Sequence, residues 1–256
     1  MADITIVTGG ISGIGAATAA TAAAKGRRVV VLDRAAQPET ASPAGVAVFP
    51  ESVDISNEAA VAAACEKIER QHGQIAGLVN AAGILGKMHT PARLTMSDWD
   101  REIAVDLRGT FITCREVGSR MARRRAGAIV NVASVVGMVS APVHAYAPAK
   151  AAVIHLTTTL AAEWGPSGVR VNCVSPGFTE TPALAKGVGA GALDRDSMTR
   201  TAALKRLVKP EEVAAAIVWL LSDEASGITG INLPVDAGYL VGAPWQAYGG
   251  LRADID

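Results

Sequence analysis

Short β-branched runs alternate along the chain with longer segments of helical composition, and this alternation constrains the fold more than any other feature. Strand-like apolar runs occupy residues 4–7, 29–32, 78–79, 128–132, 170–174 and 232–235. Helical patterns occupy residues 16–25, 58–72, 98–125, 147–164 and 211–221, and the third is predicted as one long helix. Such alternation indicates βαβ units with right-handed crossovers. We therefore expect one α/β domain, 1–256, with a doubly wound parallel sheet and helices on both faces.

Three connecting segments depart from the pattern. Residues 37–50 are rich in Pro and Ala and are predicted to be a surface connection. Residues 178–206 have little periodicity, which is typical of a mobile lid over a substrate. The C-terminal tail, residues 243–256, contains Trp245 and Tyr248 and is expected to cap its own pocket or to reach a neighbouring subunit.

Composition excludes several classes of protein. Half of the residues are hydrophobic, and the 24 basic and 24 acidic side chains balance, so we expect no nucleic-acid partner. No uncharged apolar run reaches about 18 residues and no basic signal segment begins the chain, so no membrane span or export is expected. Three separated cysteines fit a reducing cytoplasm. The four histidines lack metal-ligand spacing, so no metal is expected.

A glycine-rich loop follows the first strand and opens the first helix. Gly9, Gly13 and Gly15 form a Gly-x-x-x-Gly-x-Gly pattern. Without side chains the backbone can turn tightly and approach a pyrophosphate, which the free N–H groups of a helix N-terminus attract. The alternative is an ordinary flexible turn, because glycine-rich turns are common.

An acidic residue ends the second predicted strand. The carboxylate of Asp33 could accept hydrogen bonds from both hydroxyls of an adenosine ribose and would repel a 2′-phosphate. Arg34 beside it could instead bind such a phosphate, but no basic residue lies in the glycine loop. The sequence therefore favours NAD over NADP. A turn or capping role for Asp33 is the structural alternative.

Ser134, Tyr146 and Lys150 form the candidate catalytic group. Tyr146 and Lys150 are four residues apart, so a helix would place both on one face. A free tyrosine has a pKa of about 10, and a neighbouring ammonium group is expected to lower it. The Ser134 hydroxyl could hold a substrate oxygen. Alone, a Tyr-x-x-x-Lys pair is more often part of an ordinary amphipathic helix.

The motifs together decide the interpretation. The glycine loop, the Asn80–Gly83 turn, Ser134, the Tyr146–Lys150 segment and the Pro176-Gly177 pair occur in order. Along nearly its whole length the chain resembles the short-chain dehydrogenase/reductase family, in its ordinary form of about 250 residues. The resemblance implies a Rossmann-like sheet of about seven strands and a homotetramer, with a dimer as the alternative.

The resemblance also implies residue roles. The pyrophosphate and ribose would meet Gly9, Ser12, Gly13, Ile14 and Gly15. Asp33, with Arg34 beside it, would hold the adenosine ribose, and Asp54, flanked by Val53 and Ile55, would bind the adenine amino group. Asn80 would brace the sheet, and Ala81, Ala82 and Gly83 would run along the bound cofactor. Ser134 would orient the substrate, Tyr146 would act as general acid/base, and Lys150 would hold the nicotinamide ribose. The nicotinamide would contact Pro176, Gly177, Thr179 and Thr181.

Asp106 departs from the family pattern, which usually has Asn in a Val-Asn-Leu-x-Gly context. In the family, this Asn is associated with a water that links the lysine to solvent. If only the backbone carbonyl holds this water, the change is mild. If the side chain matters, the proton relay is altered, and Arg108 or a second water could compensate.

The predicted function is NAD(H)-dependent interconversion of a secondary alcohol and its ketone. A polyol, a sugar or a cyclic hydroxy compound fits loops that lack a basic cluster, although Arg195, Arg200 and Lys205 near the lid leave other substrates open. The alternatives are an NADPH-dependent 3-oxoacyl carrier-protein reductase and a non-catalytic NAD-binding sensor or scaffold.

Overall fold

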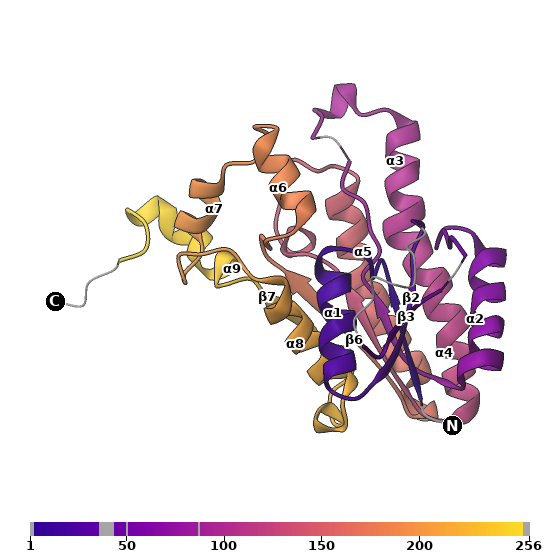
Figure 1. Ribbon diagram of the computed structural model, residues 1–256. Helices are drawn as coiled ribbons and strands as arrows, with labels where there is room; N and C mark the ends of the chain where they lie inside the picture. Colours follow the sequence, from indigo (N-terminus) through magenta and orange to yellow (C-terminus); the bar gives the residue numbers. More distant parts are fainter. Residues whose placement is uncertain (1–2, 36–43, 50, 87, 253–256) are drawn as a thin grey trace.

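The computed structural model describes residues 3–35, 44–49, 51–86 and 88–252, and in them seven parallel strands form one sheet (Figure 1). The strand order is β3-β2-β1-β4-β5-β6-β7. The bounds are β1 (Ile4–Thr8), β2 (Arg28–Leu32), β3 (Val46–Val48), β4 (Ile75–Asn80), β5 (Gly127–Val132), β6 (Val169–Pro176) and β7 (Asn232–Val235). The chain runs outward from β1 in one direction and returns to continue from β4 in the other. This confirms the predicted doubly wound, Rossmann-like sheet.

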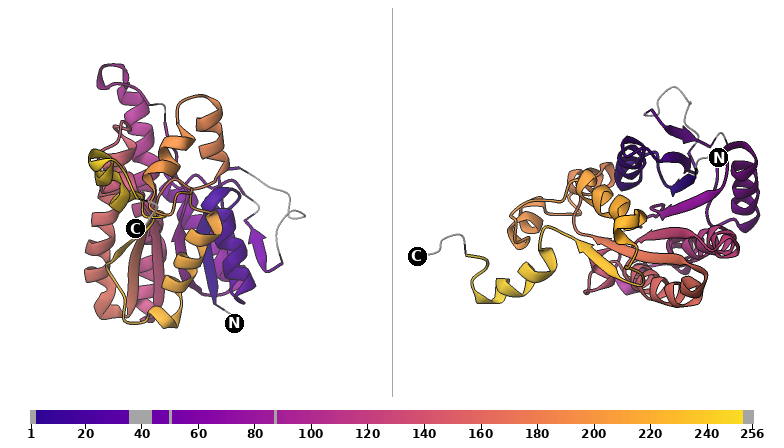
Figure 2. Two further views of the ribbon diagram at one scale, coloured as in Figure 1. Left: turned by 90° about the vertical axis from the view of Figure 1, so that its left-hand side faces the viewer. Right: turned by 90° about the horizontal axis from the view of Figure 1, so that it is seen from below.

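Helices cover both faces of the sheet (Figures 1 and 2). One face carries α1 (Gly13–Ala24) and α8 (Pro210–Leu221), and the other carries α2 (Glu58–His72), α4 (Thr110–Arg124) and α5 (Tyr146–Trp164). Successive strand residues belong to opposite cores, because side chains alternate across a strand. Ile6, for example, packs toward α2 and α4, whereas Val7 packs toward α1 and α8.

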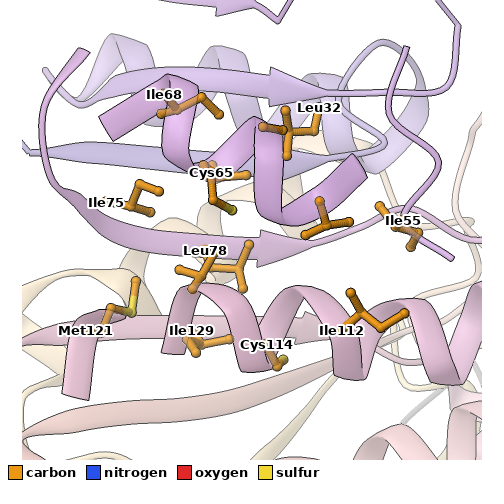
Figure 3. Packing of buried hydrophobic residues seen from close by; sticks show 14 of the residues in the cluster. Leu32, Ile55, Cys65, Ile68, Ile75, Leu78, Ile112, Cys114, Met121 and Ile129 are labelled. Atoms are coloured by element: carbon orange, nitrogen blue, oxygen red, sulfur yellow. The ribbon is translucent and has the colours of Figure 1, made fainter. Parts of the chain in front are cut away.

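Figure 3 shows the core beneath α2 and α4, where branched aliphatic side chains from strands and helices interlock. Leu78 of β4 and Ile129 of β5 are fully buried there. Cys65 and Cys114 fill small spaces in the same cluster, and Cys173 is buried beneath α5. Burial raises the pKa of each of these free thiols to about 12, so they remain protonated and unreactive.

One strand falls where the sequence predicted only a connection. Val46–Val48 forms β3 and pairs in parallel with β2, so the interpretation of residues 37–50 as a plain surface connection was wrong there. Three residues are too short to show a period of two. Residues 36–43 and 50 of that segment lie outside the described residues.

The predicted long helix over 98–125 is interrupted at its centre. α3 (Met96–Ile103) continues into a π-helical stretch, Ala104–Gly109, before α4 begins. A π-bulge adds a residue to the helical turn and is frequent at functional sites. Asp106 lies within this stretch and is fully buried against α5, so the irregularity is located at the candidate site.

The segment predicted as a lid contains two short helices, α6 (Pro182–Gly189) and α7 (Arg195–Thr201). After β7 come α9 (Tyr239–Gly242) and a 3₁₀ segment, Ala243–Tyr248, which extend away from the sheet (Figures 1 and 2). Further 3₁₀ turns span Pro91–Arg93, Val135–Gly137, Gly165–Ser167 and Asp223–Ala225. Among the described helices none is long and apolar enough to cross a membrane.

Candidate active site

The glycine loop lies at the point where the strand order reverses. β1 and β4 are neighbours, so the loop after β1 meets the turn after β4. Gly9 has a φ of 67°, and a Cβ there would lie 2.6 Å from the Cα of Ala82. A Cβ on Gly15 would lie 2.2 Å from the carbonyl oxygen of Gly9. Both positions therefore require glycine.

The N-terminus of α1 is open to an anion. Ser12 is the N-cap residue and is exposed, and its side chain makes no capping hydrogen bond. No acidic residue occupies the first turn, so the free N–H groups and the positive end of the helix dipole are not neutralised locally. Thr181 lies across the loop, 3.3 Å from the position of a Gly13 Cβ. This cradle fits the pyrophosphate of a dinucleotide.

Asp33 is held at the edge of the glycine loop. Its carboxylate accepts hydrogen bonds from the backbone N–H of Ala35 at 3.0 Å and of Ile11 at 3.4 Å. Arg34 beside it is exposed. An adenosine ribose bound next to the loop would therefore meet a carboxylate whose position is fixed by backbone donors.

Asp54 lies beside this position. The backbone N–H of Val53 donates to the carbonyl of Asp33 at 2.8 Å, which ties the two segments together. Hydrogen bonds from Ser56 lower the pKa of Asp54 against an opposing effect of burial, and Arg34 and Arg108 add to the lowering. Asp54 is thus an ionised acceptor suited to an amino group, and the side chains of Val53 and Ile55 are buried.

A buried network of amide and hydroxyl groups braces the sheet below the site. Asn80 donates to Asn131 at 2.9 Å, Asn131 donates to Thr157 at 2.9 Å, and Thr113 donates to Asn80 at 2.7 Å. Networks of this kind fix neighbouring elements when every member is satisfied. Sequence reasoning missed Thr113, Asn131 and Thr157, although polar residues at core positions of an apolar pattern were the available signal.

Ser134, Tyr146 and Lys150 converge above this network. Ser134 follows β5, Tyr146 begins α5, and Lys150 lies one turn later. The Lys150 ammonium lies 5.3 Å from the centre of the Tyr146 ring and donates to the carbonyl of Val132 at 3.1 Å. Ser134 and Tyr146 are hydrogen bonded through their side chains. The structure thus brings the three predicted catalytic residues together.

The electrostatics of this group differ from the prediction. The pKa of Tyr146 is raised rather than lowered: burial raises it most, Lys150 lowers it, and the charges of Asp106 and Glu102 raise it further. The pKa of Lys150 is also raised, because the negative charges of Tyr146 and Asp106 outweigh the opposing effect of burial. The expected lowering by Lys150 is present, but desolvation and two carboxyl groups overcome it.

Asp106 contacts the catalytic lysine directly. Its Oδ1 lies 3.5 Å from the Lys150 ammonium nitrogen and accepts a hydrogen bond from the backbone N–H of Ile84 at 3.0 Å. Its backbone carbonyl accepts from Thr110. The side chain of Asp106, and not only its backbone, therefore lies at the catalytic lysine. Arg108 is exposed, and its charge lowers the pKa of Asp54. Its electrostatic effect is therefore on Asp54 and not on Lys150.

The end of β6 approaches the same region. Gly177 donates to the carbonyl of Val235 at 2.9 Å, and a Cβ there would lie 2.7 Å from the Cα of Asp236. The buried Thr179 hydroxyl donates to the carbonyl of Gly177 at 2.9 Å. The Thr181 hydroxyl accepts from Leu184 and caps α6. Pro176 and Gly177 thus hold the strand end close to the exit of β7.

Two hollows border the site. One of about 490 Å³ lies along α6, within the size range of small-molecule sites, and is lined by Glu180, Thr181, Pro182, Leu184, Ala185, Val188, Gly189 and Arg195. The other, of about 10 Å³, lies between the loop after β4 and the loop before Tyr146. Within the described part of the chain, no three His, Cys, Asp or Glu side chains are grouped to hold a metal ion.

Comparison with known proteins identifies the family. A family model described as Enoyl-(Acyl carrier protein) reductase matches residues 9–240. D-threitol dehydrogenase from Mycolicibacterium smegmatis is 38% identical, with 93% of each chain covered. Cis-4-hydroxycyclohexanecarboxylate dehydrogenase from Sinomonas cyclohexanicum is 38% identical, with 92% of this chain and 96% of that protein covered.

Solved structures agree on the fold. A Brucella melitensis structure titled ribose-5-phosphate isomerase has a TM-score of 0.92 and 48% identity, covering 98% of this chain and 97% of the other. ElxO with bound NADP has a TM-score of 0.87 and 28% identity, covering 94% and 100%. The chain belongs to the short-chain dehydrogenase/reductase family, and it is an oxidoreductase that acts on alcohol or ketone groups.

Proposed function

We propose that this protein is an NAD(H)-dependent dehydrogenase that interconverts a small secondary alcohol and its ketone. The observation that carries the proposal is the convergence of Ser134, Tyr146 and Lys150 beside the glycine cradle of α1. The bound nicotinamide would supply the hydride acceptor or donor. The protein's own side chains would position the substrate oxygen and move its proton.

The proposed chemistry is general acid/base catalysis by Tyr146. In the oxidative direction the Tyr146 phenolate takes the proton of the alcohol, while Ser134 donates a hydrogen bond to the substrate oxygen. Lys150 stabilises the phenolate and would hold the nicotinamide ribose. The phenolate is the less populated form because burial raises the pKa of Tyr146, so turnover in the oxidative direction should increase toward alkaline pH.

The proposed substrate is a small polyol, a sugar or a cyclic hydroxy compound. Two of the dehydrogenases similar to this chain are named for threitol and for a hydroxycyclohexane carboxylate. The hollow along α6 is lined largely by small and apolar side chains, with Arg195 paired to Glu180 at 2.7 Å. This pairing leaves Arg195 less available for a phosphorylated or carrier-linked substrate.

Three alternative functions differ in the use of cofactor that they predict. A 3-oxoacyl carrier-protein reductase would use NADPH and carrier-linked ketones, and a Thermotoga maritima protein of that name is 36% identical. A sensor would bind cofactor without turnover. An isomerase, the name of the similar Brucella structure, would convert a sugar phosphate without net reduction of added cofactor. A panel of secondary alcohols with NAD⁺ or NADP⁺, followed by absorbance of the reduced cofactor, separates the two oxidoreductases by their cofactor and gives no signal for a sensor or an isomerase. Conversion of a sugar phosphate then separates the isomerase from the sensor.

The cofactor preference depends on Asp33. Asp33→Ala is expected to lower kcat/KM for NAD⁺ by about 10- to 100-fold, because hydrogen bonds to a charged group contribute about 1.5–3 kcal/mol. The value for NADP⁺ should stay constant or rise, since the repulsion of a 2′-phosphate is lost. Steady-state kinetics with both cofactors checks this, with Glu66→Gln on the exposed face of α2 as the control. An unchanged preference would assign Asp33 a structural role.

The proposed assembly is a homotetramer built on the two long helices and the last strand, with a dimer as the alternative, in the reducing cytoplasm. β7 is an edge strand, and Val241, Trp245 and Tyr248 expose apolar surface after it. Deleting 243–256 is expected to change either the mass measured by light scattering or the KM for the substrate by several-fold. If both values match the full chain, the tail has neither proposed role.

A further inference from the structure

Glu102 is a buried carboxyl group for which the proposed function has no role. It lies in the last turn of α3, and only 5% of its surface is exposed. Its carboxyl group accepts a hydrogen bond from the backbone of Gly86. A Cβ on Gly86 would lie 2.0 Å from Oε1 of Glu102, so the loop after β4 closes directly over this carboxyl group.

Glu102 and Asp106 face the same short segment of chain. The backbone N–H of Ile84 binds Asp106, and the backbone of Gly86, two residues later, binds Glu102. The two acids are four residues apart on one helical run, which places them on the same face. Asp106 contacts Lys150, and the charges of both acids raise the pKa of Tyr146, so Glu102 also lies within electrostatic reach of the catalytic centre.

Among the residues that the structure describes, the charges around this pair do not balance when both acids are ionised. Lys150 is the buried cation, and Asp106 already lies against it. From the other elements, Tyr146 faces the pair from α5, His89 and His144 line the cavity at Glu102, and Asp98 and Arg101 act from α3. A second buried carboxylate without its own cation is costly.

Asp106 also has an unused acceptor. Its Oδ2 is buried and has no hydrogen-bond partner among the described residues, although buried polar atoms are normally satisfied. A protonated Glu102 would supply an O–H donor within the same cluster. Burial is the largest cause that raises the pKa of each acid, and the charge of Asp106 raises the pKa of Glu102 further. The unpartnered Oδ2 and the burial of both carboxyl groups favour a proton retained in this cluster.

We propose that Glu102 and Asp106 share one proton at neutral pH and act together as a proton reservoir for Lys150 and Tyr146. The proton resides mainly on Glu102, because Lys150 lies against Asp106 and opposes its protonation. Glu102 is a positioning residue that acts through Asp106. Its use in turnover rests on the proposed dehydrogenase function, whereas the shared proton does not.

The cavity beside Glu102 offers a path by which the proton can leave the carboxyl pair. It has a volume of about 10 Å³, room for about one water molecule, and its lining includes Glu102, His89 and His144. In alcohol oxidation Tyr146 takes one proton from the substrate. One proton then leaves the carboxyl pair to the cavity water. A proton moves from Tyr146 through Lys150 to the carboxyl pair, which returns the pair to its protonated state. One proton is taken up and one is released, so no charge accumulates.

The shared proton has a consequence for stability in the protein without cofactor. An unfolded glutamate has a pKa of about 4.3, so the folded protein holds one more proton than the unfolded chain above that pH. The stability contribution is therefore fully present below the unfolded pKa. It is lost as pH rises through the raised pKa of the folded state. In Glu102→Gln the free energy of unfolding should no longer fall over this pH range.

Infrared difference spectroscopy of the cofactor-free protein at pH 7 is the primary test. The wild type should show the C=O stretch of a protonated carboxyl group. Glu102→Gln should remove it, because Asp106 then ionises beside Lys150. Asp106→Asn should remove it as well, because the carboxylate charge that raises the pKa of Glu102 is then absent. The exposed Glu66→Gln is the matched control and should keep the band. A wild type without the band, or a band that survives either buried substitution, would overturn the shared proton.

A kinetic experiment distinguishes a failure of this inference from a failure of the proposed function. With the substrate found in the alcohol panel, Glu102→Gln should shift the pH midpoint of kcat by about one unit or more while KM stays within about 2-fold. A merely structural role would change KM or stability at all pH values alike. If no alcohol is oxidised, the dehydrogenase proposal fails and the infrared result still stands. If turnover is normal and its pH profile is unchanged, the reservoir role fails.

Discussion

Replacing Tyr146 with Phe is expected to lower kcat/KM by about 100- to 10,000-fold, the range associated with general acid/base catalysis. The substitution removes one hydroxyl group and leaves the ring that packs beside Lys150. The glycine cradle and Asp33 are not in the changed region. Steady-state oxidation of the best alcohol, measured against pH, gives the result.

The control for this prediction is cofactor affinity. NADH titration followed by protein fluorescence should give a Kd within about 3-fold of the wild type, since a loss below 1 kcal/mol is expected for a group that does not carry binding. Ser134→Ala should give a smaller loss of kcat/KM than Tyr146→Phe. Retained activity in Tyr146→Phe would move the acid/base role to another group.

Removing the cation at Lys150 should have the largest effect on stability. Lys150→Met is expected to lower the free energy of unfolding at pH 8 by about 3–5 kcal/mol, because Asp106 is then buried without its partner. Lys150 is 4% exposed and Asp106 is fully buried, so solvent cannot replace the interaction. Activity should be lost as well. Urea unfolding measured by circular dichroism checks the stability.

A second substitution separates the two effects of Lys150. Combining Lys150→Met with Asp106→Asn should recover at least about 2 kcal/mol of the lost stability, since no uncompensated charge stays buried. Activity should not recover, because the group that stabilises the Tyr146 phenolate is still absent. Stability losses that simply add in the double variant would show that the 3.5 Å ion pair is not the source of the effect.

The sequence predicted the parts of the fold that depend on local pattern. Six of the seven strands overlap the short apolar runs that alternate with helical patterns, and the glycine loop needs its residue type at Gly9 and Gly15. Ser134, Tyr146 and Lys150 could be found because their order and spacing are specific. These signals are contained in short stretches of chain.

Other features depend on contacts between distant segments, so no local pattern revealed them. The π-helical turn at Ala104–Gly109 accompanies the burial of Asp106 against α5. The raised pKa of Tyr146 arises from burial and from two carboxyl groups in another helix. Glu102 resembles any charged helix residue until the loop at Gly86 is folded over it. β3 depends on pairing with β2.

Transfer of deuterium tests the central claim most directly. A secondary alcohol labelled with deuterium at its carbinol carbon is incubated with NAD⁺ and the protein, and the reduced cofactor is analysed by mass spectrometry. The account predicts one deuterium in each reduced cofactor molecule with the wild type, and a rate lower by the same factor as kcat/KM in Tyr146→Phe. Reduced cofactor without deuterium, or equal rates in the two proteins, would contradict hydride transfer with Tyr146 as the acid/base.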